Sequence, residues 1–326
     1  MPVAILDFGT NTFNLLIAEQ TGSGFRVLYD GKQPVKLGKG GINKRTITPE
    51  AMERGFAAIG AHMQTIRKYD AGEIHAYATS AMRNADNGRE FAAMIEKRFG
   101  FRTHIIDGEE EAALIYGGIR ESVDFGDATA MILDIGGGSN EFIICNTGGI
   151  RWKRSFELGM ARIIEMFRIS DPITPHEISN IETYYAHALK PLMDEVDRYR
   201  PTMLVGASGT FDTLAAMAAY RFGIGTGNVS SVHMAAHRFG IGAEGASSVQ
   251  IAPEFYREIH QALLHSTAEE RLNMPGMEPV RVEMIVPATI FINFVYHSCQ
   301  LESITQSRYA LKEGVMARLV AGKNTC

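Results

Sequence analysis

The segment ILDIGGGSN at residues 132–140 repeats the plan of ILDFGTN at residues 5–11, at an offset of 134 − 7 = 127 residues. In each copy an apolar run ends in an aspartate, a turn of small residues follows, and a second apolar run begins. This pattern is typical of a β-hairpin whose tip carries a carboxylate and free backbone N–H groups. One copy alone is explained by a tight turn. Two copies in matching frames predict a duplicated domain, with two phosphate-binding loops that face each other across a cleft.

The bulk composition limits the classes of protein to which the chain can belong. Its 326 residues are enough for two domains, and its 45% hydrophobic and 21% charged residues are ordinary for a globular protein. A formal charge of −5 argues against a nucleic-acid partner, and no apolar stretch approaches the ~20 residues of a membrane span. Cys145, Cys299 and Cys326 have no paired spacing, which predicts reduced thiols and a cytoplasmic location.

The order of the predicted elements is that of an α/β protein built from two similar halves. In the first half, a strand is expected at residues 35–37, and Thr48 with Pro49 predicts a helix start. In the second half, the capping box at Thr174 predicts one long helix that reaches Tyr199. Residues 230–266 are expected to form helix and loop. The two halves are expected to join near residue 123.

The hairpin tips are the first candidate sites. Successive N–H groups in a glycine-rich turn form a concave anion site, because no side chain stands in the way. The candidate phosphate-binding residues are Gly9, Thr10, Asn11 and Thr12 in the first loop and Gly136, Gly137, Gly138 and Ser139 in the second. Asp7 and Asp134 have the wrong charge for phosphate, but beside a phosphate they are suitable ligands of Mg²⁺.

A third turn, GASGT at residues 206–210, lies between a predicted buried strand and a helix. Such a turn can place a ligand at the helix N-terminus, and it adds Gly206, Ser208 and Gly209 to the phosphate-binding candidates. Ordinary packing between the strand and the helix explains this turn equally well.

Acidic and basic residues near the predicted cleft supply the remaining candidates. The run Glu109–Glu111 opens a helix that is otherwise apolar, so one of these glutamates is a candidate general base, although the spacing does not separate Glu110 from Glu111. The alternative is that acids in a first turn simply offset the helix dipole. Arg83 follows a strand, where its planar guanidinium suits a phosphoryl group. Several basic residues near the hairpins are candidates for a polyanion path: Lys32, Lys36, Lys39, Lys153 and Arg154.

Taken together and in order, five motifs resemble those of the exopolyphosphatase and guanosine pentaphosphate phosphohydrolase (Ppx/GppA) family, in the actin/Hsp70/sugar-kinase superfamily. They are DFGTNTF at 7–13, ATSAMR at 78–83, GEEEA at 108–112, DIGGGS at 134–139 followed by Glu141, and GASGT at 206–210. The resemblance covers essentially the whole chain. It implies two ribonuclease H-like domains with a cleft between them, at residues 1–123 and 124–306, with a C-terminal helix within 307–326 that packs back on the first domain.

The resemblance also implies roles for single residues and for ligands. The family's water-activating glutamate falls on Glu111, its metal- and phosphate-associated acids on Asp134 and Glu141, and its phosphate-facing arginine on Arg83. The expected cofactor is Mg²⁺, with Mn²⁺ as an alternative, and Asp7 joins the metal candidates. The expected reaction is release of terminal phosphate from inorganic polyphosphate or from guanosine pentaphosphate or tetraphosphate. The family further implies a homodimer.

Some positions depart from the family pattern. Asn14 stands where the family has a basic residue, Asn140 where it has threonine, and Arg308 adds a positive charge near the C-terminus. Longer relatives carry an additional helical domain, so we expect the short, two-domain form here. The altered loop positions leave the substrate open between polyphosphate and the guanosine nucleotides.

Two other functions fit the same fold. A small-metabolite kinase of this superfamily is expected to use an aspartate base near the start of the second domain, whereas Glu111 lies in the first. A regulator that binds polyphosphate or guanosine tetraphosphate without turnover has no use for a carboxylate base beside a polyanion. Both features favour hydrolysis over these alternatives.

Overall fold

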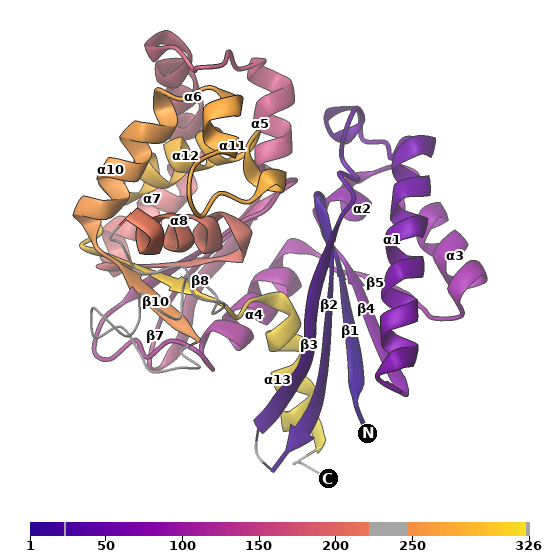
Figure 1. The fold of residues 1–326 in the computed structure, drawn as a ribbon. Helices are drawn as coiled ribbons and strands as arrows, with labels where there is room; N and C mark the ends of the chain where they lie inside the picture. Colours follow the sequence, from indigo (N-terminus) through magenta and orange to yellow (C-terminus); the bar gives the residue numbers. More distant parts are fainter. Residues whose placement is uncertain (23, 222–246, 324–326) are drawn as a thin grey trace.

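Each half of the chain forms one β-sheet in the computed structural model, which describes residues 1–22, 24–221 and 247–323 (Figure 1). The first sheet has the order β3-β2-β1-β4-β5. Its strands are β1 Val3–Phe8, β2 Thr12–Thr21, β3 Gly24–Pro34, β4 Glu73–Ala78 and β5 Thr103–Ile105. The first three strands are antiparallel, and β4 and β5 run parallel to β1.

The second sheet repeats this plan and adds one strand at its edge. Its order is β10-β11-β9-β6-β7-β8. Its strands are β6 Ala130–Ile135, β7 Asn140–Asn146, β8 Gly149–Phe156, β9 Met203–Ala207, β10 Ser248–Ile251 and β11 Ser303–Ser307. Shifting β1 by 127 residues gives residues 130–135, which are the bounds of β6. The predicted fold class, two ribonuclease H-like α/β halves, is therefore confirmed.

The helices of the first half cover one face of its sheet. They are η1 Ile42–Lys44, α1 Pro49–Lys68, α2 Ser80–Asn84 and α3 Gly88–Phe99. The Thr48 side chain caps α1 by accepting from the Ala51 N–H, as the sequence predicted. A buried core joins the sheet to α1 and α3 through Phe13, Ile59 and Phe91. Burial of these apolar side chains stabilises this half.

Two helices lie between the sheets and join the halves: α4 Gly108–Ile119 and α13 Leu311–Lys323 (Figure 1). One buried cluster includes Ile5 of β1, Ile132 of β6, Ile115 of α4 and Val315 of α13. The two helices are in close contact, because a Cβ on Gly314 would lie 1.8 Å from the Leu114 carbonyl oxygen. This shared core holds the N-terminus of α4 at the cleft between the sheets.

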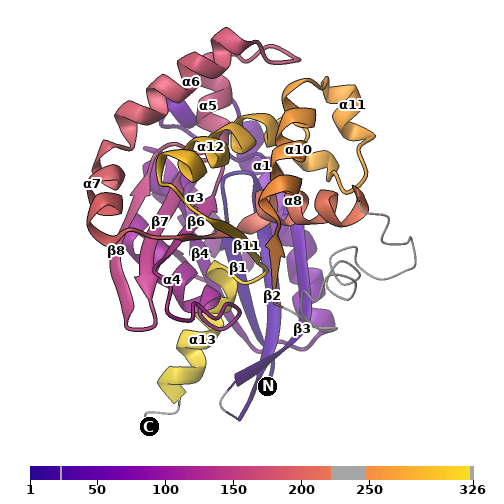
Figure 2. The same cartoon turned by 90° about the vertical axis from the view of Figure 1, so that its left-hand side faces the viewer.

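The remaining helices cover the second sheet. They are α5 Met160–Phe167, α6 Pro175–Ala188, α7 Lys190–Tyr199, α8 Ser208–Arg221, α10 Pro253–Leu264, α11 Ala268–Leu272, η2 Pro279–Arg281 and α12 Ile285–Ser298. Figure 2 shows α6, α10 and α12 on the same side of this sheet, and α12 contacts both of the others. Their apolar faces enclose the largest buried cluster, which includes Tyr185 and Phe291.

Two local predictions were wrong. The helix expected from Thr174 to Tyr199 is broken into α6 and α7 at Leu189, because Pro191 has no N–H to bond back into the preceding turn. The strand expected at residues 35–37 is absent, and Lys36 has a positive φ of 47°. The N–H groups of Val35 and Lys36 instead donate to the Asn11 carbonyl and brace the first hairpin. Residues 230–246 of the helix and loop expected at 230–266 lie outside the described residues, and the described part holds the strand β10, paired with β11, before helix α10.

Candidate active site

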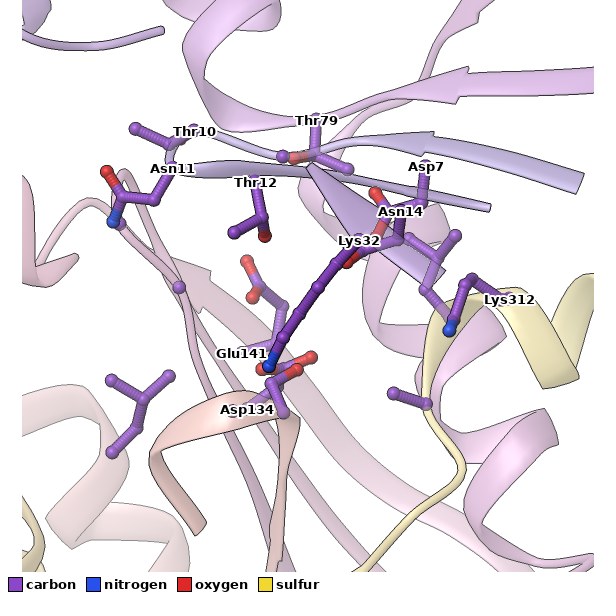
Figure 3. A pocket seen from close by; sticks show the side chains of 18 of the residues that line it. Asp7, Thr10, Asn11, Thr12, Asn14, Lys32, Thr79, Asp134, Glu141 and Lys312 are labelled. Atoms are coloured by element: carbon purple, nitrogen blue, oxygen red, sulfur yellow. Dashed lines mark hydrogen bonds between the residues drawn. The ribbon is translucent and has the colours of Figure 1, made fainter. Parts of the chain in front are cut away.

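A cleft of about 320 Å³ lies between the two sheets, at the ends of β1 and β6 (Figure 3). The candidate catalytic, phosphate-binding and metal-binding residues all line this cleft except Arg83 and Gly206. Of the basic candidates for a polyanion path, Lys32 lines the cleft, whereas Lys36, Lys39, Lys153 and Arg154 do not. Gly206 is buried within β9, where a Cβ would lie 2.1 Å from the Phe211 ring. Its small size therefore serves packing, and the structure does not bring it to the cleft.

The two hairpin tips touch each other. A Cβ on Gly137 would lie 2.2 Å from Nδ2 of Asn11, and one on Gly138 would lie 2.6 Å from Oγ1 of Thr10. On the other side of the second tip, a Cβ on Gly159 would lie 2.3 Å from the Gly138 nitrogen. The glycines of this loop are thus required by close packing as well as by the approach of a ligand.

Both tips leave backbone donors uncommitted. The carbonyls of the second tip accept from the start of α5, where the Met160 N–H donates to Gly136 and the Ala161 N–H to Gly137. The carbonyls of the first tip accept from residues 35–38. Within the described chain, no hydrogen bond is formed by the N–H groups of four tip residues: Thr10, Asn11, Gly137 and Gly138. This arrangement is suited to binding anionic oxygens.

The structure separates the three glutamates at the start of α4. The Glu110 side chain pairs with Arg318 at 3.2 Å on the outside, and that of Glu109 lies 3.5 Å from Lys153. Glu111 is buried and lines the cleft. Burial, followed by the charge of Glu141, raises the pKa of Glu111 well above its usual value. Glu111 is therefore the one acid of this run that is placed to take a proton in the cleft.

Arg83 lies behind Glu111 rather than in the cleft lining. Its guanidinium donates to the Glu111 carboxylate at 2.6 Å and to the Ile106 carbonyl at 3.2 Å. A longer contact of 3.4 Å reaches the Ser139 hydroxyl, and Glu157 lies 3.6 Å away. The expectation that Arg83 faces the phosphate stays a prediction. Its contact with Glu111, the candidate base, is direct. The positive charge of Arg83 opposes the rise in the pKa of Glu111.

Glu141 and Asp134 form the acidic side of the second hairpin. The two residues are paired across β6 and β7, and the hydroxyls of Ser139 and Ser155 both donate to Oε1 of Glu141 at 2.7 Å. Burial raises the pKa of Asp134 to about 6. Burial, with the charge of Asp134, raises the pKa of Glu141 to about 7. A cation bound beside them would stabilise the ionised forms of these two buried carboxyl groups.

The first hairpin carries Asp7 at the position equivalent to Asp134. Its carboxylate accepts from the Asn14 side chain at 2.8 Å, and burial raises the pKa of Asp7 to about 6. Asn14 lines the cleft, as its place beside the loop suggested. Asn140 does not line it, because its side chain is buried and donates to the Leu158 carbonyl at 2.9 Å. Asn140 is thus a packing residue of the second hairpin.

Several charged residues of the cleft were missed at the sequence level, among them Asp212 and Arg281. Asp212 lies in the first turns of α8, where Gln306 donates to its carboxylate at 2.7 Å, and burial raises the pKa of Asp212 to about 6. The GASGT turn just before it was the available signal. Arg281 belongs to η2 and lies over Gly209, and its buried Nε has no hydrogen-bond partner in the described residues. No sequence motif marks Arg281.

The charges of the cleft bear on whether a metal ion fits it. Seven carboxylates line the cleft against four cationic side chains: Asp7, Asp30, Glu111, Asp134, Glu141, Asp212 and Glu313 against Lys32, Arg281, Arg308 and Lys312. Alone, this lining repels a phosphate. The described residues contain no group of three or more Asp, Glu, His or Cys side chains that could hold a metal unaided. Oxygen ligands of this kind fit Mg²⁺, which commonly takes one or two carboxylates together with substrate phosphates.

A pH-dependent loss of stability is expected for the metal-free protein. Four buried carboxyl groups have pKa values above the ordinary 3.8 of aspartate or 4.5 of glutamate: Asp7, Asp134, Asp212 and Glu141. The folded state therefore binds more protons than the unfolded chain between about pH 4 and pH 7, and stability falls as the pH rises through that window. In thermal scans with a chelator, Tm should be several degrees lower at about pH 8 than at about pH 5, and Mg²⁺ should restore it at the higher pH.

The control for this experiment is the variant Asp212→Asn. Its Tm should fall less steeply with pH, because one carboxyl group with a raised pKa is gone. A Tm that rises with pH across this range, or that Mg²⁺ leaves unchanged at about pH 8, would contradict the expected role of the acidic cluster.

Comparison with known proteins supplies the assignment. Residues 16–322 match the sequence profile of the Ppx/GppA phosphatase family. The chain belongs to the Ppx/GppA phosphatase family. A Haemophilus influenzae relative named "Putative exopolyphosphatase" is 24% identical over 317 residues, which cover 97% of this chain and 91% of the relative. The resemblance found in the motifs is thereby confirmed, and it places the chain among hydrolases.

Two solved structures show how closely this family member keeps the common fold. An exopolyphosphatase from Cytophaga hutchinsonii is 35% identical and superposes with a TM-score of 0.90, covering 99% of this chain and 98% of the other. The Ppx/GppA family member from Aquifex aeolicus is 20% identical, with a TM-score of 0.76 and 99% of both chains covered. Among its described helices, this protein has none with the length and apolar character of a membrane span.

Proposed function

We propose that this protein is a phosphohydrolase that releases the terminal phosphate of inorganic polyphosphate by in-line attack of water. One observation carries the proposal: two hairpin tips with uncommitted N–H groups lie in the same cleft as Glu111, a buried carboxylate supported by an arginine. Phosphoryl transfer needs mainly positioning and stabilisation of charge on the phosphoryl oxygens, and N–H groups of this kind provide both.

In the proposed reaction, Glu111 accepts the proton of the attacking water. Its raised pKa makes it a stronger base than an ordinary glutamate, and the positive charge of Arg83 favours its ionised form. The tip N–H groups and the hydroxyls of Thr10, Thr12 and Ser139 orient the terminal phosphate. The buried position of Glu111 on α4 keeps its carboxylate fixed, because α4 is packed between the two sheets.

Asp134 and Glu141 are the residues proposed to hold Mg²⁺, or Mn²⁺ in its place. Bound there, the ion supplies positive charge to the phosphate oxygens. Asp7 is the weaker candidate for a metal ligand. The Asn14 amide already donates a hydrogen bond to one of its carboxylate oxygens, and the positive charge of Lys312 offsets its negative charge.

Guanosine pentaphosphate and tetraphosphate are proposed as further substrates, on the strength of the family alone. A cytoplasmic location is part of the same proposal and is supported by Cys145 and Cys299, which are free, buried thiols. The homodimer stays a prediction from the family.

The deciding experiment measures phosphate release by the purified protein with Mg²⁺ from short polyphosphate, long polyphosphate and guanosine pentaphosphate, assayed side by side. We expect release from at least one polyphosphate, and loss of that release on chelation. Release of phosphate from none of the three would overturn the proposal. Release from guanosine pentaphosphate alone would reassign the substrate while keeping the reaction.

A further inference from the structure

Lys32 is the cation that the first sheet directs into the cleft. It is paired with Asn14 across β2 and β3, and Asn14 is paired with Asp7 across β1 and β2. Residues paired in this way share one face of a sheet. The three side chains therefore form a row at the cleft end of the first sheet, and Figure 3 shows Lys32 reaching from this row into the pocket.

The ammonium group of Lys32 is held from the other half of the molecule. Its Nζ donates to the carboxylate of Glu278 at 2.5 Å, and Glu278 directly precedes η2. Lys32 lines the cleft, whereas Glu278 does not. Both side chains are partly exposed, at 43% and 35%, so the pair is one that contributes little to stability and exchanges partners readily.

Of the other three cations that line the cleft, Lys312 and Arg281 are held in place and differ from Lys32. Lys312 is mostly buried and is committed to Asp30, with Glu313 also within 3.8 Å. Arg281 is fixed over Gly209 by close packing. Lys32 alone among these three combines a flexible side chain with a counter-ion that lies outside the cleft lining. It can therefore turn toward a phosphate without leaving a buried charge unpaired.

We propose that Lys32 binds the condensed-phosphate chain behind the scissile phosphoryl group, and that Glu278 is the counter-ion that this chain displaces. Lys32 is thus a substrate-binding residue contributed by the first half. Glu278, from the second half, competes with the substrate for the Lys32 ammonium group. The inference rests on the proposed function, because it assumes that a linear chain of phosphates enters the cleft.

The test compares the two partners of the pair. If the pair only joins the two halves, Lys32→Met and Glu278→Gln break the same contact and change affinity in the same direction. If Lys32 binds substrate, they act in opposite directions. Lys32→Met should weaken binding by roughly 10-fold or more, as expected for loss of a charged hydrogen bond. Glu278→Gln should tighten binding by roughly two- to fivefold, because the competing ion pair is gone.

The neighbouring pair supplies matched controls. Lys36 donates to Glu283 at 2.7 Å, also between the two halves, and neither residue lines the cleft. Lys36→Met and Glu283→Gln remove the same charges and should leave affinity within about twofold of the parent. Binding is measured by calorimetry with sodium tripolyphosphate and Mg²⁺, in the Glu111→Gln background so that turnover is slow during the titration.

The outcomes separate this inference from the proposed function. The inference is supported if the Lys32 and Glu278 variants change the affinity for tripolyphosphate in opposite directions while the two control variants leave it unchanged. Effects in the same direction, or unchanged affinity for Lys32→Met, overturn it even if the wild-type protein releases phosphate. Opposite effects without phosphate release from any polyphosphate by the wild-type protein would instead overturn the proposed hydrolysis and retain Lys32 as a binding residue.

Discussion

Replacing Glu111 by Gln should lower kcat for phosphate release by about 10²–10⁴-fold, the usual contribution of a general base. The amide has nearly the same shape, so the hydrogen bond with Arg83 and the packing of α4 are retained. Substrate affinity should change little, because the lost carboxylate acts on water rather than on the phosphate chain. The measurement is steady-state release of phosphate from polyphosphate with Mg²⁺, together with Tm to verify folding.

Glu110→Gln is the matched control for this prediction. Glu110 is the adjacent residue on the same helix, but it faces outward and pairs with Arg318. Its replacement should leave kcat within about twofold, because exposed ion pairs contribute little. A Glu111→Gln protein with the kcat of the wild type would refute the role of Glu111, and an equal loss in both variants would indicate damage to α4 rather than to the base.

Replacing Arg83 by Met should raise the pKa of Glu111 further, because the only adjacent positive charge among its described contacts is lost. An opposite charge at this range lowers a carboxyl pKa by about 1–3 units. The acidic limb of the pH–rate profile should therefore move up by about that amount, and kcat at neutral pH should fall by roughly 10–10³-fold. The pH–rate profile distinguishes this effect from simple loss of phosphate binding, which lowers the rate at every pH.

Glu157→Gln provides the comparison for Arg83. It removes the second acidic neighbour of the guanidinium, 3.6 Å away, and leaves the contact with Glu111 in place. The acidic limb should stay within a few tenths of a pH unit of the wild type, since Glu157 is about half exposed. If Arg83→Met leaves the acidic limb where it was, the arginine does not control the ionisation of Glu111.

The repeat of the two hairpins was readable from the sequence because its causes are local. An apolar run, an aspartate, a turn of small residues and a second apolar run are enough to predict a strand, a turn and a second strand. The structure matches these hairpins to the residue, with Asp7 opposite Asn14 and Asp134 opposite Glu141. Two local predictions failed for specific reasons. Pro191 interrupts one predicted helix, and residues 35 and 36 donate their N–H groups to the Asn11 carbonyl instead of forming a strand.

Three features of the cleft depended on contacts between residues far apart in the chain. The spacing left Glu110 and Glu111 open, and only the resemblance to the family pointed to Glu111. The packing of α4 gives the physical reason, because Glu111 is buried whereas Glu110 pairs with Arg318 on the outside. Arg281 enters the cleft from η2, far from any motif, and the partners of Lys32 and Arg83 lie in other segments. Pairings of this kind have no periodicity that a sequence pattern can reveal.

The sequence by itself determined the duplicated α/β fold, the family and the two hairpin loops, because turn chemistry and apolar patterning act over a few residues. Only the tertiary structure decided which glutamate faces the cleft, where Arg83 points and which cations remain available for a phosphate chain. Those properties follow from burial and from charge pairing between the two halves, which exist only when both sheets pack on α4 and α13.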